Sequence, residues 1–156
     1  MKPLFLLSLI ILTLTACQPD DVGDLVAPGN SCGSSGARVE ATVEGSDWCA
    51  NASVIAIGDG ASITITGINL TGGTLIMQLD SLATGPRAIT EADNAILYMD
   101  LGLPYTSLTT DPGTLTIATL DTVAHKVTGA FEVTLHADGV GAKNLSGSFD
   151  VVYTQQ

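Results

Sequence analysis

Apolar and polar residues alternate with a period of two through most of the chain after residue 37. Alternation of this kind is typical of strands that bury one face and leave the other in water. The clearest apolar series are Val39, Ala41 and Val43, then Leu75, Met77 and Leu79. Beyond the N-terminal apolar run, no segment of useful length has the period of an amphipathic helix. The pattern predicts an all-β domain over residues 38–156.

Turns rich in glycine and proline divide this domain into short strands. Residues 58–60 (GDG) and 72–73 (GG) are strong turn signals, and Gly67 between them predicts a β-bulge. Residues 54–57 are apolar on both faces, residues 86–90 indicate a short edge strand, and residues 104–112 predict a loop. We expect an antiparallel β-sandwich or a partly open barrel of about eight or nine strands, and the sequence does not separate the two.

The last part of the domain contains two related segments. Residues 128–133 (TGAFEV) and 146–151 (SGSFDV) each place a glycine before an inward Phe and Val, with an acid facing outward between them. A glycine-rich loop at residues 138–144 connects them, as expected of antiparallel neighbours. The core face that they are predicted to share consists of Phe131, Val133, Leu135, Phe149, Val151 and Tyr153.

Residues 1–16 have the three parts of an export signal. Lys2 supplies the positive charge, residues 4–12 form an apolar run too short to span a membrane, and small residues lead to Cys17. The sequence LTAC at residues 14–17 matches the lipobox of bacterial lipoproteins, whose cysteine is diacylated on sulfur, freed by cleavage and acylated on its new amine. We expect a lipoprotein signal peptide and lipidation of Cys17. The alternative is an ordinary secreted protein with a chance cysteine at this position.

The residues around Cys17 also predict a location. Gln18 follows the cysteine, where an aspartate would resemble the inner-membrane retention signal. We therefore expect a lipid-anchored protein of the bacterial cell envelope, at the outer membrane. Residues 17–37 are rich in Pro, Gly, Ser and Asp, which predicts a lipidated, flexible tether. Asp20, Asp21 and Asp24 are interpreted as a solvated charge cluster that could hold a cation weakly.

Charge and aromatic content exclude some classes of partner. The chain has a net charge of −11, and removal of Lys2 with the signal peptide makes it more negative. Such a chain repels phosphate backbones, so nucleic acid is not an expected partner. Few aromatic residues remain, and most of them fall at predicted core positions, which disfavours a glycan-binding surface.

Two cysteines remain once Cys17 is lipidated. Cys32 and Cys49 form an even pair in an oxidising compartment, and we expect a disulfide between them. The bond would close a loop of about 15 residues and contribute about 3 kcal/mol in the chain-entropy model. The alternative is a pair of redox-active thiols, which no Cys-x-x-Cys spacing supports.

Residues that could carry chemistry are scattered along the chain. His125 falls in a predicted turn and His136 on the outward face of its strand, and neither has partners at a spacing typical of zinc. Glu91 and Asp93 could pair as acid and base, although a solvated turn is the simpler interpretation. Members of a Ser-His-Asp triad need not be neighbours in sequence, so the many Ser and Asp residues identify none. We expect no catalytic residue, metal or cofactor, and we assign no ligand-binding residue.

The motif VEGSDW at residues 43–48 and the two Gly-x-Phe-acid-Val segments invite a comparison. With them, the domain resembles a group of small uncharacterised bacterial lipoproteins, known as a domain of unknown function with a predicted all-β fold. The resemblance covers residues 39–153, and Cys32 and Cys49 depart from it. It implies an all-β fold and brings no catalytic residues.

Two non-enzymatic functions fit these observations. The first is an interaction or structural module that binds another envelope protein through loops or a sheet edge, such as the edge at residues 86–90. The second is a carrier that holds a small apolar ligand inside the barrel or sandwich. A hydrolase with an unrecognised site is the least expected function. We favour the interaction module because it demands least of the sequence.

Overall fold

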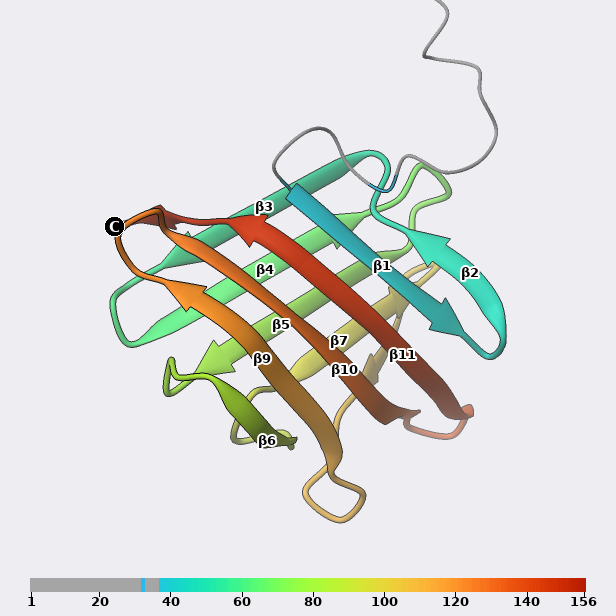
Figure 1. Ribbon diagram of the computed structural model, residues 1–156. Coiled ribbons are helices and arrows are strands. Elements are labelled where there is room, and N and C mark those ends of the chain that lie inside the picture. Colours follow the sequence, from blue (N-terminus) through green and yellow to red (C-terminus); the bar gives the residue numbers. More distant parts are fainter. Residues whose placement is uncertain (1–31, 33–36) are drawn as a thin grey trace, which may run out of the picture. The chain divides into compact units, whose positions relative to one another are not determined.

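The computed structural model describes Cys32 and residues 37–156, and Figure 1 shows their arrangement. The predicted signal peptide, the lipidation site Cys17, and Asp20, Asp21 and Asp24 lie outside the described residues. The all-β class is confirmed, because the described residues form strands and no helix. It follows that no helix of this part of the chain is long and apolar enough to cross a membrane.

The described residues form twelve strands, where the sequence predicts eight or nine. Short strands account for much of the difference, since β2 and β8 have four residues each and β12 has two. In chain order the strands are β1 (Ala37–Val43), β2 (Ser46–Cys49), β3 (Ser53–Gly58), β4 (Ser62–Ile68), β5 (Thr74–Asp80), β6 (Gly85–Ile89), β7 (Ile96–Asp100), β8 (Leu103–Thr106), β9 (Gly113–Asp121), β10 (Lys126–Ala137), β11 (Gly141–Val152) and β12 (Thr154–Gln155).

The strands form one open sheet in the order β12-β3-β4-β5-β7-β8-β10-β11-β1-β2, with β9 beside β10 and β6 beside β9. The pairings are antiparallel, as predicted, except that β12 runs parallel to β3. Within the described residues β6 pairs with β9 alone, which confirms the predicted edge strand. One backbone pairing, His136 with Thr106, joins β10 to β8.

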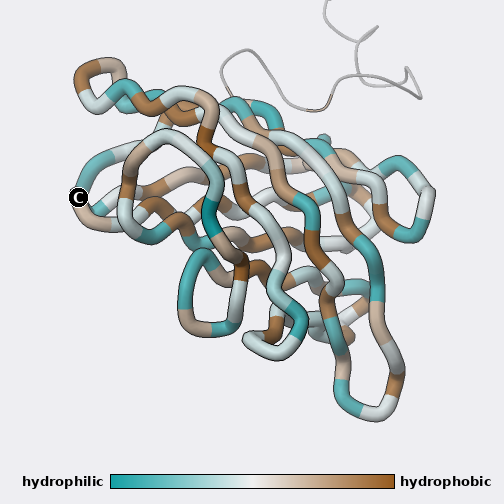
Figure 2. Tube along the Cα trace, turned by 60° about the horizontal axis from the view of Figure 1, so that its bottom comes forward, coloured by the Kyte–Doolittle hydropathy of each residue, from teal (hydrophilic) through white to brown (hydrophobic). Residues whose placement is uncertain are grey.

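The sheet folds over itself into two layers that enclose the core (Figure 1). We call β6, β9, β10, β11, β1 and β2 the front layer, and β12, β3, β4, β5, β7 and β8 the back layer. Trp48 of the front layer meets Tyr98 of the back layer edge to face, with ring centroids 6.2 Å apart. Hydropathy alternates along the strands in Figure 2, because each strand turns one face to the core. All six residues of the predicted shared core face are at most 5% exposed, which confirms that prediction.

β10 and β11 are the longest strands, with twelve residues each, and they pair along their whole length. Their register places the glycine of each related segment opposite the phenylalanine of the other: Gly129 faces Phe149, and Gly147 faces Phe131. A Cβ atom at Gly129 would lie 2.5 Å from Phe149 Cζ, and one at Gly147 would lie 2.7 Å from Phe131 Cζ. Each ring therefore occupies the space that a side chain on the opposite strand would need.

The prediction of a bulge at Gly67 is wrong. β4 pairs with both neighbours without a register shift, and Gly67 faces Leu75 of β5 in a regular ladder. Its missing side chain serves packing instead, because a Cβ atom there would lie 2.9 Å from Ala50 Cβ and 3.2 Å from Trp48 Cη2. The register shift that the structure does contain lies at Gly129, between β10 and β9.

Two predicted loops are shorter than expected. Residues 104–106 belong to β8, which forms a hairpin with β7 and places Pro104 opposite Met99. Proline cannot donate a backbone hydrogen bond, and so it obscured this short strand in the sequence. The loop predicted at residues 138–144 is reduced to a tight turn, because β11 begins at Gly141.

Aspartate side chains hold two of the turns. Asp59 Oδ1 accepts hydrogen bonds from the backbone N–H groups of Ser62 and Ala61, at 2.7 and 2.9 Å. Asp121 Oδ1 accepts the equivalent bonds from the residues three and two positions later, at 2.8 and 2.9 Å. Because these bonds favour the carboxylate, they lower the pKa of both aspartates below the ordinary value of 3.8.

We expect Gly129→Ala to lower the free energy of unfolding by about 1–3 kcal/mol, because the added methyl group would lie 2.5 Å from both the ring of Phe149 and the backbone oxygen of Thr116. Urea denaturation measures this loss. In a Phe149→Leu background the same change should cost less, since only the contact with the backbone oxygen of Thr116 remains. Equal losses in the two backgrounds would contradict the glycine–ring contact.

The aspartate turns predict a dependence of stability on pH. Because the pKa values of Asp59 and Asp121 are lower in the folded state, the unfolded chain binds more protons in acid. Their contribution is complete at neutral pH and is lost as the pH falls below about 4, through the folded-state values. Replacing both aspartates with asparagine should therefore make stability fall less steeply in acid, as measured by urea denaturation at a series of pH values. If the variant and the unmodified protein lose stability equally as the pH falls, the two aspartates are not the cause of the acid sensitivity.

Candidate binding surfaces

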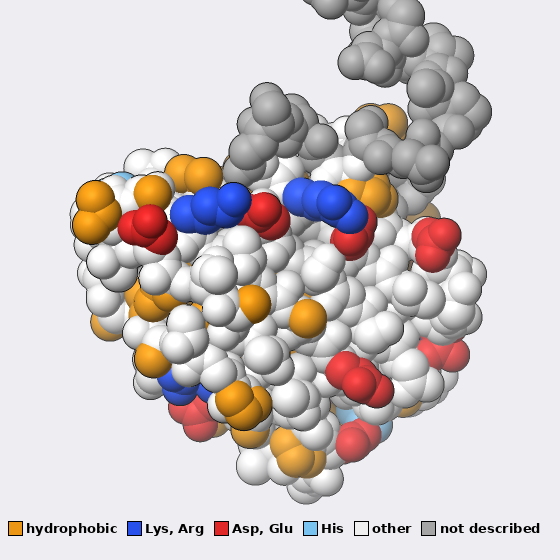
Figure 3. Space-filling view, in the orientation of Figure 1, with side chains coloured by type: hydrophobic (Ala, Val, Ile, Leu, Met, Phe, Trp, Pro, Cys, Tyr) orange, Lys and Arg blue, Asp and Glu red, His pale blue; other side chains and the backbone are white. Residues whose placement is uncertain are grey.

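The outer face of the front layer is mostly polar, with scattered hydrophobic side chains (Figure 3). Hydroxyl, amide and backbone groups cover most of it, and charged side chains form ion pairs. Arg38 pairs with Glu40 at 2.5 Å, and Lys126 pairs with Asp150 at 3.0 Å. The hydrogen bond from Arg38, with a smaller one from Ser148, lowers the pKa of Glu40. These two basic groups are thus paired with acids close by.

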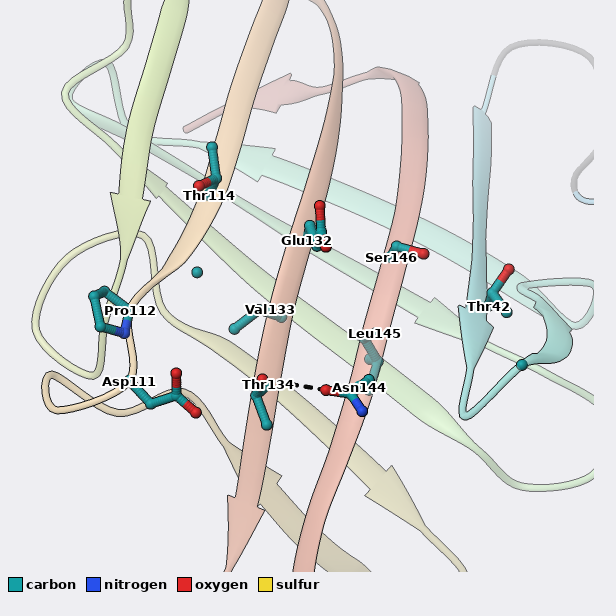
Figure 4. Close-up of a pocket in the computed structure, with 12 residues that line it drawn as sticks. Thr42, Asp111, Pro112, Thr114, Glu132, Val133, Thr134, Asn144, Leu145 and Ser146 are labelled. Atoms are coloured by element: carbon teal, nitrogen blue, oxygen red, sulfur yellow. Dashed lines mark hydrogen bonds between the residues drawn. The ribbon is translucent and has the colours of Figure 1, made fainter.

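A polar hollow of ≈490 Å³ opens on the front layer, between the loop before β9 and strands β10 and β11 (Figure 4). Two carboxylates, Glu132 and Asp111, line it together with hydroxyl and amide groups. Thr134 donates a hydrogen bond of 3.2 Å to Asn144 within it. No aromatic ring is among the residues that line this hollow. It therefore lacks the stacking surface of a typical sugar site.

His136 contacts Asp111, which lines this hollow, and so holds the loop before β9. Its Nε2 lies 2.9 Å from Asp111 Oδ2, and its side chain is one-third exposed (33%). Among the described residues no serine or threonine hydroxyl forms a hydrogen bond with His136. The pair thus has two members of a triad geometry without a nucleophile, and it fastens the loop to β10.

The other candidate residues named from the sequence are separated along the chain from His136 and Asp111. His125 packs against Tyr153, with ring centroids 5.3 Å apart, in the turn where it is predicted. Glu91 and Asp93 are exposed in the turn after β6, which agrees with a solvated turn. Across Cys32 and residues 37–156, no three His, Cys, Asp or Glu side chains converge as metal ligands would.

The outer face of the back layer differs from the front, because its strand residues are uncharged across three adjacent rungs. Ile55 and Ile57 of β3 are 51% and 39% exposed. The central rung consists of Ile55, Thr66, Ile76, Leu97 and Thr106. The rungs on either side contain Ser53, Ile68, Thr74, Met99 and Pro104, and Ile57, Thr64 and Gln78. We call these thirteen residues the uncharged face. The stretch that is apolar on both faces at residues 54–57 was its one signal in the sequence.

A second hollow, of ≈330 Å³, opens at one end of the uncharged face, where β5, β7 and β8 meet. Its apolar lining comes from Ile76, Ala95, Ile96 and Leu97. Polar groups around it belong to Thr64, Gln78, Glu91, Thr106 and Ser107. Glu91 carries the one charge among the residues that line this hollow.

The edge strand β6 is protected by its own chain. Asn94 Nδ2 donates a hydrogen bond of 3.0 Å to the backbone oxygen of Ala88. Pro86 has no N–H to offer, and the Arg87 guanidinium donates a bond of 3.2 Å to the backbone oxygen of Ala83. Natural sheets block their edges with prolines and local contacts of this kind. β6 is therefore a less open template for strand addition than its edge position suggests.

The predicted disulfide pair is confirmed. Cys32 and Cys49 are bonded, with their Cα atoms 5.0 Å apart, and they are 17 positions apart in the sequence. Cys49 ends β2, next to the buried Trp48. The bond thus ties the chain before β1 to the far end of the first hairpin.

Comparison with protein-family models, with curated proteins and with solved structures gave no match. The resemblance to small bacterial lipoproteins, like the lipidation of Cys17, stays a prediction. The functional argument therefore rests on the residues and geometry of this chain.

We expect replacement of both Cys32 and Cys49 with serine to lower the free energy of unfolding by about 3 kcal/mol, because the open chain gains entropy when it unfolds. Urea denaturation measures the loss, and a reducing agent should weaken the unmodified protein without affecting the variant. Native mass spectrometry of residues 18–156, exported to an oxidising compartment, should give a mass lower by two hydrogens than the reduced chain. Free thiols in that sample would contradict the assignment.

Proposed function

We propose that this protein is a non-catalytic interaction module of the bacterial cell envelope, anchored by lipid on Cys17, and that it docks a protein partner on the uncharged face. The observation that carries this proposal is the contrast between the two outer faces. The front layer carries ion pairs and a polar hollow. The uncharged face holds two isoleucines that are 51% and 39% exposed.

The energetics of association support this choice of face. Burying the exposed half of an isoleucine side chain contributes about 1 kcal/mol, and no charge on these rungs has to be desolvated. The strongly acidic rest of the chain keeps the domain soluble and opposes indiscriminate association. Contiguous apolar patches on soluble proteins often mark interaction sites.

The uncharged face is a better candidate than the edge of β6. At that edge Asn94 and Pro86 reduce the backbone groups that an added strand needs. The face presents rungs of Ile, Thr and Leu side chains, which another apolar surface can cover without rearranging the sheet. We therefore assign docking to the face, and the edge serves as the comparison.

The two alternative functions have less support. A carrier needs room between the layers, where the described core is filled by side chains such as Trp48, Phe131 and Phe149. A hydrolase needs an activated nucleophile, and the His136–Asp111 pair stands without one among the described residues. An apolar ligand that co-purifies in stoichiometric amount would favour the carrier.

A photoreactive amino acid placed at Ile55 or Thr66 should give one discrete cross-linked partner in intact cells. The same amino acid at Thr128 or Ser146, on the front layer, should give none, because these positions face water in the proposed complex. Adducts from both faces, or from the front layer alone, would contradict the assignment.

Charge substitutions then separate the face from the edge. With the cross-linked partner purified, Ile55→Lys should weaken binding at least ten-fold, since it buries an unpaired ammonium group. Ala88→Lys, the same introduced charge at an exposed position on β6, should leave the affinity nearly unchanged. The opposite pattern would assign docking to the edge strand. Circular dichroism and thermal unfolding check that both variants remain folded.

A further inference from the structure

We infer that the hollow at the end of β5, β7 and β8 receives an aliphatic side chain of the partner that is flanked by a lysine or arginine. The inference rests on the proposed function and deepens it by naming the chemistry of the partner. It combines three features of the hollow: its size, its apolar lining and the single carboxylate beside it.

Size and lining select an aliphatic group. The hollow measures ≈330 Å³, at the low end of the range for ligand pockets. Ile76 and Leu97, which face each other on β5 and β7, form part of its lining and are both only partly buried. A leucine, isoleucine or methionine side chain seated there would complete their burial. A charged or amide side chain would lose its hydration without a partner among these apolar groups.

The carboxylate of Glu91 selects a neighbouring cation. Glu91 is exposed beside the hollow, and Thr109 Oγ1 donates a hydrogen bond of 3.3 Å to its Oε1. No lysine or arginine lines the hollow, so within this site the carboxylate has no basic partner. A lysine or arginine next to the inserted residue would lie beside Glu91. The acidic chain as a whole attracts the same charge.

The polar rim suits an extended backbone. Thr64, Gln78 and Thr106 offer hydroxyl and amide groups on the strands around the apolar lining. All three are exposed, so they are free to exchange water for the backbone of a bound segment. An extended segment with one apolar side chain pointing down and a basic side chain beside it therefore fits this site.

A peptide titration followed by methyl NMR tests the inference on the whole domain, residues 18–156. The probe is an acetylated and amidated hexapeptide with a central leucine flanked by lysines. One control peptide replaces the lysines with glutamates, and a second replaces the leucine with serine. Glu91→Gln removes the carboxylate, and Glu132→Gln is the matched control, because it makes the same change at an exposed glutamate of the front layer.

The lysine peptide should shift the methyl resonances of Ile76, Ala95 and Leu97, and leave those of Val140 and Val152 in place. It should bind about two- to five-fold more tightly than the glutamate peptide, as expected of an exposed ion pair. Glu91→Gln should reduce that preference more than Glu132→Gln does, because both variants lose one charge and only Glu91 lies beside the hollow. The serine peptide should not shift these methyl groups.

Either of two results would overturn the inference: shifts confined to other methyl groups, or a preference for lysine that Glu91→Gln lowers no more than Glu132→Gln does. Cross-linking at Ile55 reports on the proposed function independently, since that residue lies outside the hollow. Cross-links at Ile55 with no peptide binding would keep the docking face and discard the aliphatic–basic partner. Peptide binding without cross-links would keep the aliphatic–basic ligand of the hollow and discard the docking face.

Discussion

The structure depends on the reciprocal contact between glycine and phenylalanine in the β10–β11 hairpin. Phe131 and Phe149 point into the core from neighbouring strands, and each takes the space left empty by the glycine opposite. This contact fixes the register of the two longest strands, because a slip of one residue would send both rings to the solvent face. β10 and β11 in turn supply the ladders for β9 and β1, so the front layer is built outward from this pair.

The sequence predicted those features that alternation and turn chemistry encode locally. The buried faces of β1, β5, β10 and β11 follow from a period of two in the sequence. The disulfide follows from the even number of cysteines that remain once Cys17 is set aside. Features set by contacts between distant segments were missed. Gly67 looks like a bulge in sequence, yet its role depends on Trp48 approaching from the other layer. The two-residue β12, which pairs parallel to β3, has no pattern long enough to detect.

The candidate sites also combine features that the local sequence predicts with features that depend on contacts between distant segments. Alternation places Ile76 on the outside of its strand, but only the observed register puts it in one rung with Ile55 and Leu97. The hollow beside Glu91 also needs the turn after β6 to fold back toward β7, which no local signal announces. Conversely, the two histidines attract attention in sequence, and the structure uses them to hold a loop and to pack against a tyrosine.

The pairing of β1 with β11 has a consequence for how the domain forms. Ala37 lies opposite Val151, so the first described strand finds its ladder more than a hundred residues later in the chain. Contacts this distant close slowly, because the intervening loop must lose its freedom before the ladder stabilises it. For a chain exported as its N-terminus predicts, the front layer stays incomplete while the chain is threaded through the membrane. The topology itself then delays folding until passage is nearly over.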